Sequence, residues 1–384
     1  SMRYRSRPHA GPRSAFLWPE SEDQTIFMSD LPSSYRTGDA ELDAQIAALV
    51  DHVAPHEQEL VFEMVVSALR LAAEDVDRGE LKLVNSAVKE LRYSFEVFAP
   101  YDGINKCTIF GSARIKRGDP AYESAKDFAA RIAGRDWMVI TGAGPGIMEA
   151  GHEGAGAAKS FGVNIVLPFE SGANPVIAGD PKLINFRYFF TRKVMFMKES
   201  QAFVLLPGGF GTMDESFELL TLIQTGKSPL APVVLLDPPG STYWSHWQRF
   251  VEAELRDEGL ISADDLCLVK VVDTIDAAVE EVCRFYRTYD SMRLVGNTLV
   301  LRVKRAIGDG ELAALNDAFD DIVEEGSIER IETTQAEMRD GDKVELHRVG
   351  FQFGRHKWSR LRRLIDALND HPDSLVEREK RVTE

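Results

Sequence analysis

The sequence predicts an α/β protein built on a doubly wound, Rossmann-like parallel sheet, with a helical region before it and a small α+β unit after it. Between residues 101 and 290, short apolar runs alternate with amphipathic segments of helix length. This alternation is typical of repeated βαβ units, whose parallel strands are covered by helices on both faces. Two of the runs end in glycine clusters that open a helix, at 141–149 and 207–215. Ligands of such sheets bind beyond the carboxyl ends of the strands.

The part of the chain before the sheet divides into two segments. Residues 1–38 are rich in Arg, Pro and Ser without any apolar period, so we expect an extended arm there. In residues 39–100 the apolar residues recur at spacings of three and four, which indicates helices. We expect three of them.

The predicted Rossmann-like domain covers residues 101–290, and its strands are the apolar runs. They are 107–110, 137–141, 163–167, 202–206, 233–236 and 268–272. A separate α+β unit is expected at 291–370, followed by a disordered tail at 371–384. Its predicted elements are a strand at 294–303, a helix at 311–323, strands at 328–333 and 344–353, and a helix at 357–368.

Composition narrows the class of protein. A formal net charge of -16 disfavours binding to a nucleic-acid backbone, and the basic cluster at 355–363 is expected to be a solvated helix face. Three widely spaced cysteines fit a reducing compartment, so we expect a cytoplasmic protein. No apolar stretch is long enough for a membrane span, and the histidines show no spacing typical of metal ligands, so neither a membrane nor a metal is expected.

The loop Pro207–Glu215 (PGGFGTMDE) is the most informative feature of the chain. It follows a buried strand and opens a helix, so its backbone N–H groups and the positive end of the helix dipole favour a phosphate. Thr212 and Glu215 also have the S/T-x-x-E spacing of a capping box, in which the glutamate only satisfies a backbone donor. Spacing alone leaves both interpretations of Glu215 open.

The second cluster, TGAGPGIME at 141–149, also lies between a strand and a helix. A dinucleotide-binding fingerprint needs its third glycine one place later and has no proline at Pro145, although Glu170 could stand for the ribose-binding acid. We therefore do not expect NAD or another cofactor. The GKS at 226–228 lacks the first glycine and the preceding strand of a P-loop.

The residues expected near Glu215 favour a functional site. The segment FFTRK at 189–193 opens the preceding helix, whose N-terminus should face the same crevice as that of the helix after Pro207. Arg192 and Glu215 beside a phosphate cradle would suit the cleavage of a sugar phosphate, although Arg192 could also be an ordinary first-turn arginine. Ser112, in the turn after the first strand, could reach the phosphate or simply stabilise its turn.

With these motifs in view, residues 104 to about 285 resemble the Lonely Guy family of nucleoside 5'-monophosphate phosphoribohydrolases, which are often mislabelled as lysine decarboxylases. The resemblance rests on four segments. They are PGGFGTMDE (207–215), matching PGGxGTxxE, TGAGPGIMEA (141–150), NPVIAGDPKLINFRYFFTRKVMF (174–196) and IFGSAR (109–114). Ala143 stands where glycine is common, and His152 where asparagine is common, which could alter the base accepted.

The resemblance implies roles for particular residues. Arg192 and Glu215 match the catalytic arginine and glutamate. The glycine loops would hold the phosphate and ribose, and further residues of the same motifs are expected to contact the substrate. The binding residues expected in this way are Gly208, Gly209, Gly211, Thr212, Gly144, Gly146, Ser112, Lys193 and Glu149.

The implied activity is hydrolysis of the N-glycosidic bond of an AMP-like nucleoside monophosphate to free base and ribose 5-phosphate. The alternative is a non-catalytic sensor or carrier of a nucleotide-like ligand on the same fold. The resemblance also implies a homodimer or higher homo-oligomer, with part of the contact made by the apolar helix at 186–197. The alternative is that this helix is simply buried between the sheet and neighbouring helices. Longer bacterial nucleotide nucleosidases, which this chain resembles, carry flanking regions that can bind regulators. The flanking segments 39–98 and 291–370 are therefore expected to set the oligomeric state or to gate access to the site.

Overall fold

The structure is a computed structural model that describes residues 35–53, 57–167 and 172–370. The predicted arm and tail lie outside these residues, apart from 35–38, and so does Glu170. The chain divides into two compact units, of which the smaller spans residues 21–90 and the larger includes residues 91–370. No helix in the described part of the chain is long and apolar enough to cross a membrane.

The smaller unit is helical, as the three- and four-residue spacing predicts. It contains α1 (Ala40–Val53), α2 (Gln58–Ala73) and most of α3 (Arg78–Phe98). One face of α1 and one face of α2 form a small core of four buried side chains. They are Ile46, Val50, Phe62 and Val66.

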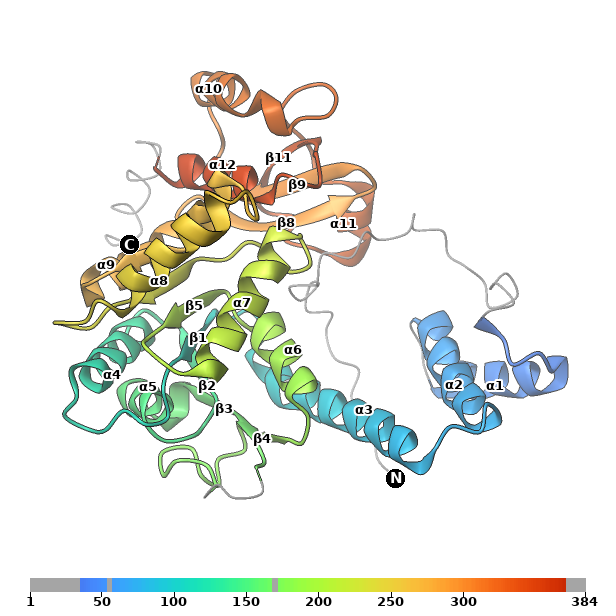
Figure 1. Ribbon diagram of the computed structural model, residues 1–384. Coiled ribbons are helices and arrows are strands. Elements are labelled where there is room, and N and C mark those ends of the chain that lie inside the picture. Colours follow the sequence, from blue (N-terminus) through green and yellow to red (C-terminus); the bar gives the residue numbers. More distant parts are fainter. Residues whose placement is uncertain (1–34, 54–56, 168–171, 371–384) are drawn as a thin grey trace. The chain divides into compact units, whose positions relative to one another are not determined.

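The larger unit is built on a parallel sheet of seven strands in the order β4-β3-β2-β1-β5-β6-β7 (Figure 1). Its strands are β1 (Lys106–Phe110), β2 (Met138–Thr141), β3 (Ser160–Ile165), β4 (Leu183–Phe186), β5 (Ala202–Leu205), β6 (Val233–Leu236) and β7 (Lys270–Val272). The predicted doubly wound parallel sheet is therefore confirmed. The order reverses between β1 and β5, and this switch point is where such sheets bind ligands.

Alternate strand residues point to opposite faces of the sheet and enter two separate cores. On β1, Cys107 and Ile109 enter the core under α4 (Pro120–Ala133), α5 (Ile147–Ala155) and α9 (Ile275–Phe285). Phe110 enters the other core, which includes side chains of α6 (Phe189–Glu199) and α7 (Phe210–Gln224). Helices thus cover both faces, as the alternating pattern predicts.

The C-terminal segment forms a second sheet, antiparallel and of four strands, in the order β10-β11-β9-β8. Its elements are β8 (Tyr289–Val295), β9 (Thr298–Val303), α10 (Asp309–Phe319), β10 (Glu329–Arg330), α11 (Gln335–Asp340), β11 (His347–Gln352) and α12 (Trp358–Asp370). The expected single strand at 294–303 is wrong, because Gly296 and Asn297 turn the chain into a hairpin. Gly296 has a φ of 58°, which glycine adopts without steric cost.

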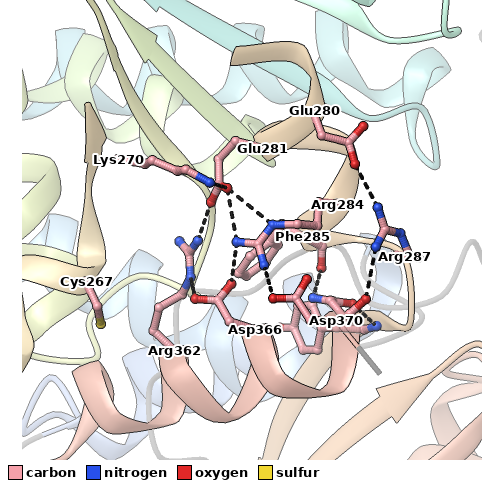
Figure 2. A network of polar contacts seen from close by, with 12 residues as sticks. Cys267, Lys270, Glu280, Glu281, Arg284, Phe285, Arg287, Arg362, Asp366 and Asp370 are labelled. Atoms are coloured by element: carbon pink, nitrogen blue, oxygen red, sulfur yellow. Dashed lines mark hydrogen bonds and ion pairs between the residues drawn. The ribbon is translucent and has the colours of Figure 1, made fainter. Parts of the chain in front are cut away.

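The C-terminal segment shares its core with the parallel sheet. Trp358, Leu361 and Leu364 of α12 belong to the same cluster as Phe203 of β5. The expectation that 355–363 is a solvated helix face fails at Arg362, which is 3% exposed. Its guanidinium contacts Glu281 of α9 at 2.6 Å, in the polar network of Figure 2.

Candidate functional site

Three loops that follow neighbouring strands are joined by backbone hydrogen bonds at the carboxyl edge of the sheet. The N–H of Ser112, after β1, donates to the carbonyl of Pro207, after β5, at 3.2 Å. The carbonyl of Ser112 accepts from the N–H of Ile147, at the start of α5, at 3.1 Å. The peptides around Ser112 therefore hold both predicted glycine loops together.

The loop after β5 leaves the start of α7 exposed. Gly209 is the N-cap residue, and Gly209, Phe210 and Gly211 are exposed. Apart from the chain neighbours and the backbone of α7 itself, no atom of the described residues lies within 4 Å of a Cβ built at Gly209 or Gly211. The first N–H groups of a helix have no partner within the helix, and the dipole makes this end attractive to an anion. The predicted cradle is therefore accessible to a ligand.

The capping-box interpretation of Glu215 is wrong. The helix begins at Phe210, which makes Thr212 the third helical residue rather than the cap, and the N-cap Gly209 has no side-chain cap. Glu215 is the sixth residue of α7, beyond the first turn. Its position therefore serves neither the cap nor the free amides of the helix end.

Arg192 is held by three different parts of the fold. Its Nε donates to the carbonyl of Val163 on β3 at 2.9 Å, and its guanidinium carbon lies 5.1 Å from the ring centre of Phe196. A Cβ built at Gly142 would come within 2.3 Å of its Nη2. The absence of a side chain at Gly142 thus gives the guanidinium its place above the end of β2.

The structure brings Arg192 and Glu215 together. The Nη2 of Arg192 lies 3.9 Å from the Oε1 of Glu215, and the two side chains are 9% and 14% exposed. This distance is typical of an ion pair but too long for a hydrogen bond. Burial raises the pKa of Glu215 to about 7, although the charge of Arg192 acts in the opposite direction. A carboxyl group with this pKa can exist in both protonation states near neutral pH.

The loop after β2 depends on left-handed backbone positions. Gly146 has a φ of 70°, and a Cβ there would meet the carbonyl oxygen of Ser112 at 2.4 Å. Ala143 also lies in this region, with a φ of 61°, where glycine is the less strained residue. This conformation explains why glycine is common at that position in the family the sequence resembles.

His152 supports this loop from inside the core. It is fully buried, and its Nε2 lies 3.0 Å from the carbonyl oxygen of Phe161. Its Nδ1 lies 3.1 Å from the amide nitrogen of Asn174, which also donates to the carbonyls of Ala143 and Gly144. Burial lowers the pKa of His152, which favours the neutral ring. An effect of His152 on the accepted base stays a prediction.

Three of the predicted binding side chains have other partners in the structure. The Nζ of Lys193 lies 2.7 Å from a carboxylate oxygen of Asp214, and Glu149 accepts a hydrogen bond from Arg117 at 2.8 Å. The Oγ of Ser112 accepts from the N–H of Arg114, as expected of a turn serine. Contacts of these three side chains with a substrate stay predictions.

The apolar residues expected at a homodimer contact lie inside the chain's own core. Met195, Phe196 and Met197 of α6 are all buried. The exposed apolar side chains of this helix are Phe189 and Phe190, at its beginning. The apolar character of α6 is therefore explained by its own fold, and the homodimer stays a prediction.

Two supporting residues are not among the predicted site residues. Gly142 provides space for Arg192, and Asn174 fixes the carbonyls of the loop after β2. Both residues lie in the segments that carry the resemblance, so the motifs include them, but their sequence positions do not reveal which residues they support. Among the described residues, no group of three His, Cys, Asp or Glu side chains could hold a metal ion.

Comparisons with known proteins find relatives of the part of the chain that contains this site. The model of a family described as possible lysine decarboxylase matches residues 146–282. A cytokinin riboside 5'-monophosphate phosphoribohydrolase of Mycobacterium tuberculosis is 30% identical over 160 residues, which cover 41% of this chain and 82% of that protein. The protein of the same description named LOG3 in Arabidopsis thaliana is 29% identical over 161 residues, covering 41% of this chain and 71% of its own.

Among solved structures, the molybdenum cofactor carrier protein of Chlamydomonas reinhardtii matches 47% of this chain and 96% of its own. The identity is 20% and the TM-score is 0.33. A likeness this weak carries no argument about function.

Proposed function

This chain belongs to the Lonely Guy family, and on that premise we propose that it hydrolyses the N-glycosidic bond of nucleoside 5'-monophosphates, with AMP as the first candidate. The products would be the free base and ribose 5-phosphate. The relatives are named for cytokinin riboside 5'-monophosphates, so such a nucleotide is the second candidate.

The observation that carries this proposal is the largely buried pair of Arg192 and Glu215 at the same sheet edge as an open helix N-terminus. The two residues come from different helices, and neither is needed as a cap. Burial of a carboxyl group next to an incompletely neutralising cation is costly, and such perturbed groups concentrate at functional sites. A purely structural pair would be expected to form a direct hydrogen bond.

The start of α7 is suited to the 5'-phosphate. The amides of the first helical turn and the helix dipole favour an anion there, and Gly209 and Gly211 let it approach the backbone. Binding energy from this non-reacting phosphate would position the sugar for the chemical step. Arg192 can add a planar, permanently charged donor for phosphate or ribose oxygens.

In the proposed reaction the bond between C1' of the ribose and the base nitrogen breaks, and both electrons leave with the base. Positive charge then develops on the ribose ring, and the ionised carboxylate of Glu215 would stabilise it. A water oxygen bonds to C1'. One hydrogen of the water stays on this oxygen as the new hydroxyl. The other is released as a proton, and the leaving base takes up one proton, so that the number of protons in solution does not change.

A lysine decarboxylase is not supported, despite the description of the matching family. A lysine that forms a Schiff base needs a lowered pKa. Burial alone would lower the pKa of Lys193, but Asp214 and Glu218 outweigh burial and raise it. Lys198, in the last turn of the same helix, is bound to Glu199 at 2.7 Å.

The test is a panel of nucleoside monophosphates assayed for release of base and ribose 5-phosphate. Glu215→Gln should lower kcat/KM by roughly a hundredfold or more, because it removes the charge opposite the developing cation. Glu218→Gln, one turn further along α7, is the matched control and should stay within a fewfold of the wild type. The proposal fails if no monophosphate is cleaved, or if the two variants have equal activity.

A further inference from the structure

Tyr243 contacts the phosphate cradle from outside the motifs that identify it. It is the first residue of α8 (Tyr243–Phe250), after β6, and its hydroxyl donates to the carbonyl of Gly208 at 2.6 Å. Burial raises the pKa of Tyr243, so the phenol stays protonated and remains a donor at neutral pH. This bond connects the loop after β6 to the loop after β5.

The geometry of a peptide gives this bond a directional effect. The peptide between Gly208 and Gly209 is planar and trans, so its carbonyl and its N–H point in opposite directions. A carbonyl held toward Tyr243 therefore fixes the N–H of Gly209 away from it. Gly209 is the N-cap of α7, so this N–H lies at the helix end where the phosphate is proposed to bind.

The Gly208–Gly209 peptide needs an external constraint. Both flanking residues are glycine, which can adopt either sign of φ, so rotation of this peptide meets little steric resistance from side chains. Gly208 packs closely against Thr212, since a Cβ built at Gly208 would come within 2.1 Å of the Oγ1 of Thr212. Apart from its two chain neighbours, no described atom lies within 4 Å of a Cβ built at Gly209, although its carbonyl accepts a hydrogen bond from the N–H of Met213 at 3.1 Å.

Tyr243 is itself held in place. Asp237, 4% exposed at the end of β6, accepts from the N–H of Trp244 at 3.1 Å and from Ser241 Oγ at 2.9 Å. The Oγ of Ser241 in turn accepts from the N–H of Tyr243 at 3.1 Å. The ring of Tyr243 packs edge-on against Trp244, with their centres 4.9 Å apart. The donor thus has a fixed position.

We propose that Tyr243 is a positioning residue of the phosphate site, which holds the Gly208 carbonyl so that the Gly209 N–H points at the 5'-phosphate. The proposal rests on the proposed function for the identity of the ligand. It adds a role for a residue that does not touch the substrate and acts through the backbone of the cradle.

The chain contains a matched control for this bond. The hydroxyl of Tyr286 donates to the carbonyl of Gln201 at 2.7 Å, just before β5, whereas Gly208 lies just after β5. Tyr243→Phe and Tyr286→Phe therefore each remove one hydroxyl bond to a backbone carbonyl, at opposite ends of the same strand. A role in stability alone would make the two variants equivalent.

The probes are inorganic phosphate and ribose 5-phosphate, titrated by calorimetry into the full-length chain. Tyr243→Phe should raise the Kd of both by about tenfold, the effect of losing roughly one hydrogen bond. The KM for the cleaved monophosphate should rise by a similar factor while kcat stays within about twofold, because uniform binding is lost. Tyr286→Phe should leave all of these values unchanged.

The outcomes separate this inference from the proposed function. Weaker phosphate binding in Tyr243→Phe alone supports the role of Tyr243, even if no monophosphate is cleaved. Cleavage by the wild type with identical constants in Tyr243→Phe overturns the role of Tyr243 and leaves the proposed function standing. Equal losses in both tyrosine variants also overturn it, because the effect would then be one of general stability.

Discussion

Two glutamates with little exposed surface are neutralised to very different extents in this chain. Glu281 on α9 is 1% exposed and is contacted by Arg362 at 2.6 Å, Lys270 at 2.9 Å and Arg284 at 3.0 Å (Figure 2). Burial alone would raise the pKa of Glu281, but these three cations lower it. Glu215 has Arg192 at 3.9 Å, and its pKa is raised to about 7.

The difference separates a structural carboxylate from a candidate catalytic one. Glu281 has direct bonds to several cations, so its charge is compensated when the protein folds. Glu215 is left with an incomplete partner, which destabilises its ionised form in the absence of a ligand. Such a group can respond to positive charge that appears only during a reaction, and groups of this kind are expected at active sites.

The largest expected effect comes from removing the compensated charge. Glu281→Gln should lower the free energy of unfolding by roughly 3–5 kcal/mol, because it leaves buried cations without their shared carboxylate. Denaturant unfolding measures this. Glu280→Gln is the control, because Glu280 is 46% exposed and contacts only the nearby Arg287 among the residues of Figure 2. Its cost should be under about 1 kcal/mol. Equal costs would remove the contrast between the two sites.

Removing the uncompensated charge of Glu215 should change the free energy of unfolding in the opposite direction. A carboxyl whose pKa rises from 4.5 to about 7 on folding disfavours the folded state above pH 7, by up to about 3 kcal/mol. Glu215→Gln should therefore stabilise the protein at pH 8 by up to that amount. The gain should shrink as the pH falls through 7 and vanish below about 4.5, where Glu215 is protonated in both states. Urea unfolding at pH 8 and pH 4.5 tests this, and a less stable variant at pH 8 would contradict it.

A smaller effect should follow from a substitution that moves the side chain of Arg192 but leaves this residue in the sequence. In Gly142→Ala the new Cβ would need the space of the guanidinium, so Arg192 should move and kcat/KM should fall by about tenfold or more, which is at least about 1.4 kcal/mol. The pH of half-maximal activity should also rise. The charge of Arg192 lowers the pKa of Glu215 against the effect of burial, and this charge would lie further away in the variant.

The control for this variant is Gly134→Ala, whose Cβ would approach only backbone oxygens at 3.4 Å, at the end of α4. It should leave the pH profile unchanged. A Gly142→Ala enzyme with the wild-type profile would show that the position of Arg192 does not influence Glu215.

The sequence alone predicts the parallel sheet and the proximity of Arg192 and Glu215. Apolar runs mark the buried strands, and motifs at strand ends converge because parallel strands end at one edge. The β8–β9 hairpin was missed because its two apolar runs are separated only by Gly296 and Asn297, although this pair is a known turn signal. The strand β4 was missed because the exposed Asn185 interrupts its apolar residues, whereas the equally short β5 and β6 are continuous apolar runs.

Two other contacts, one at the site and one in the core, leave no local signal. The bond of Tyr243 is made to a backbone carbonyl, which no residue type at position 208 reveals. The partner of Glu281 in α12, Arg362, lies 81 residues away, inside a run of basic residues that looks like a solvated face. Spacing within one helix predicts an exposed cation there, and only the tertiary fold places it in a core.

The network around Glu281 also bears on where this protein can be cut. The family match ends at residue 282, so a fragment trimmed to it would keep Glu281 but lose Arg284 and Arg362. It would also lose Trp358 and Leu361, which share a core with the parallel sheet. The border of similarity therefore falls inside a shared core, and we expect a stable fragment that contains the parallel sheet to need the chain through Asp370.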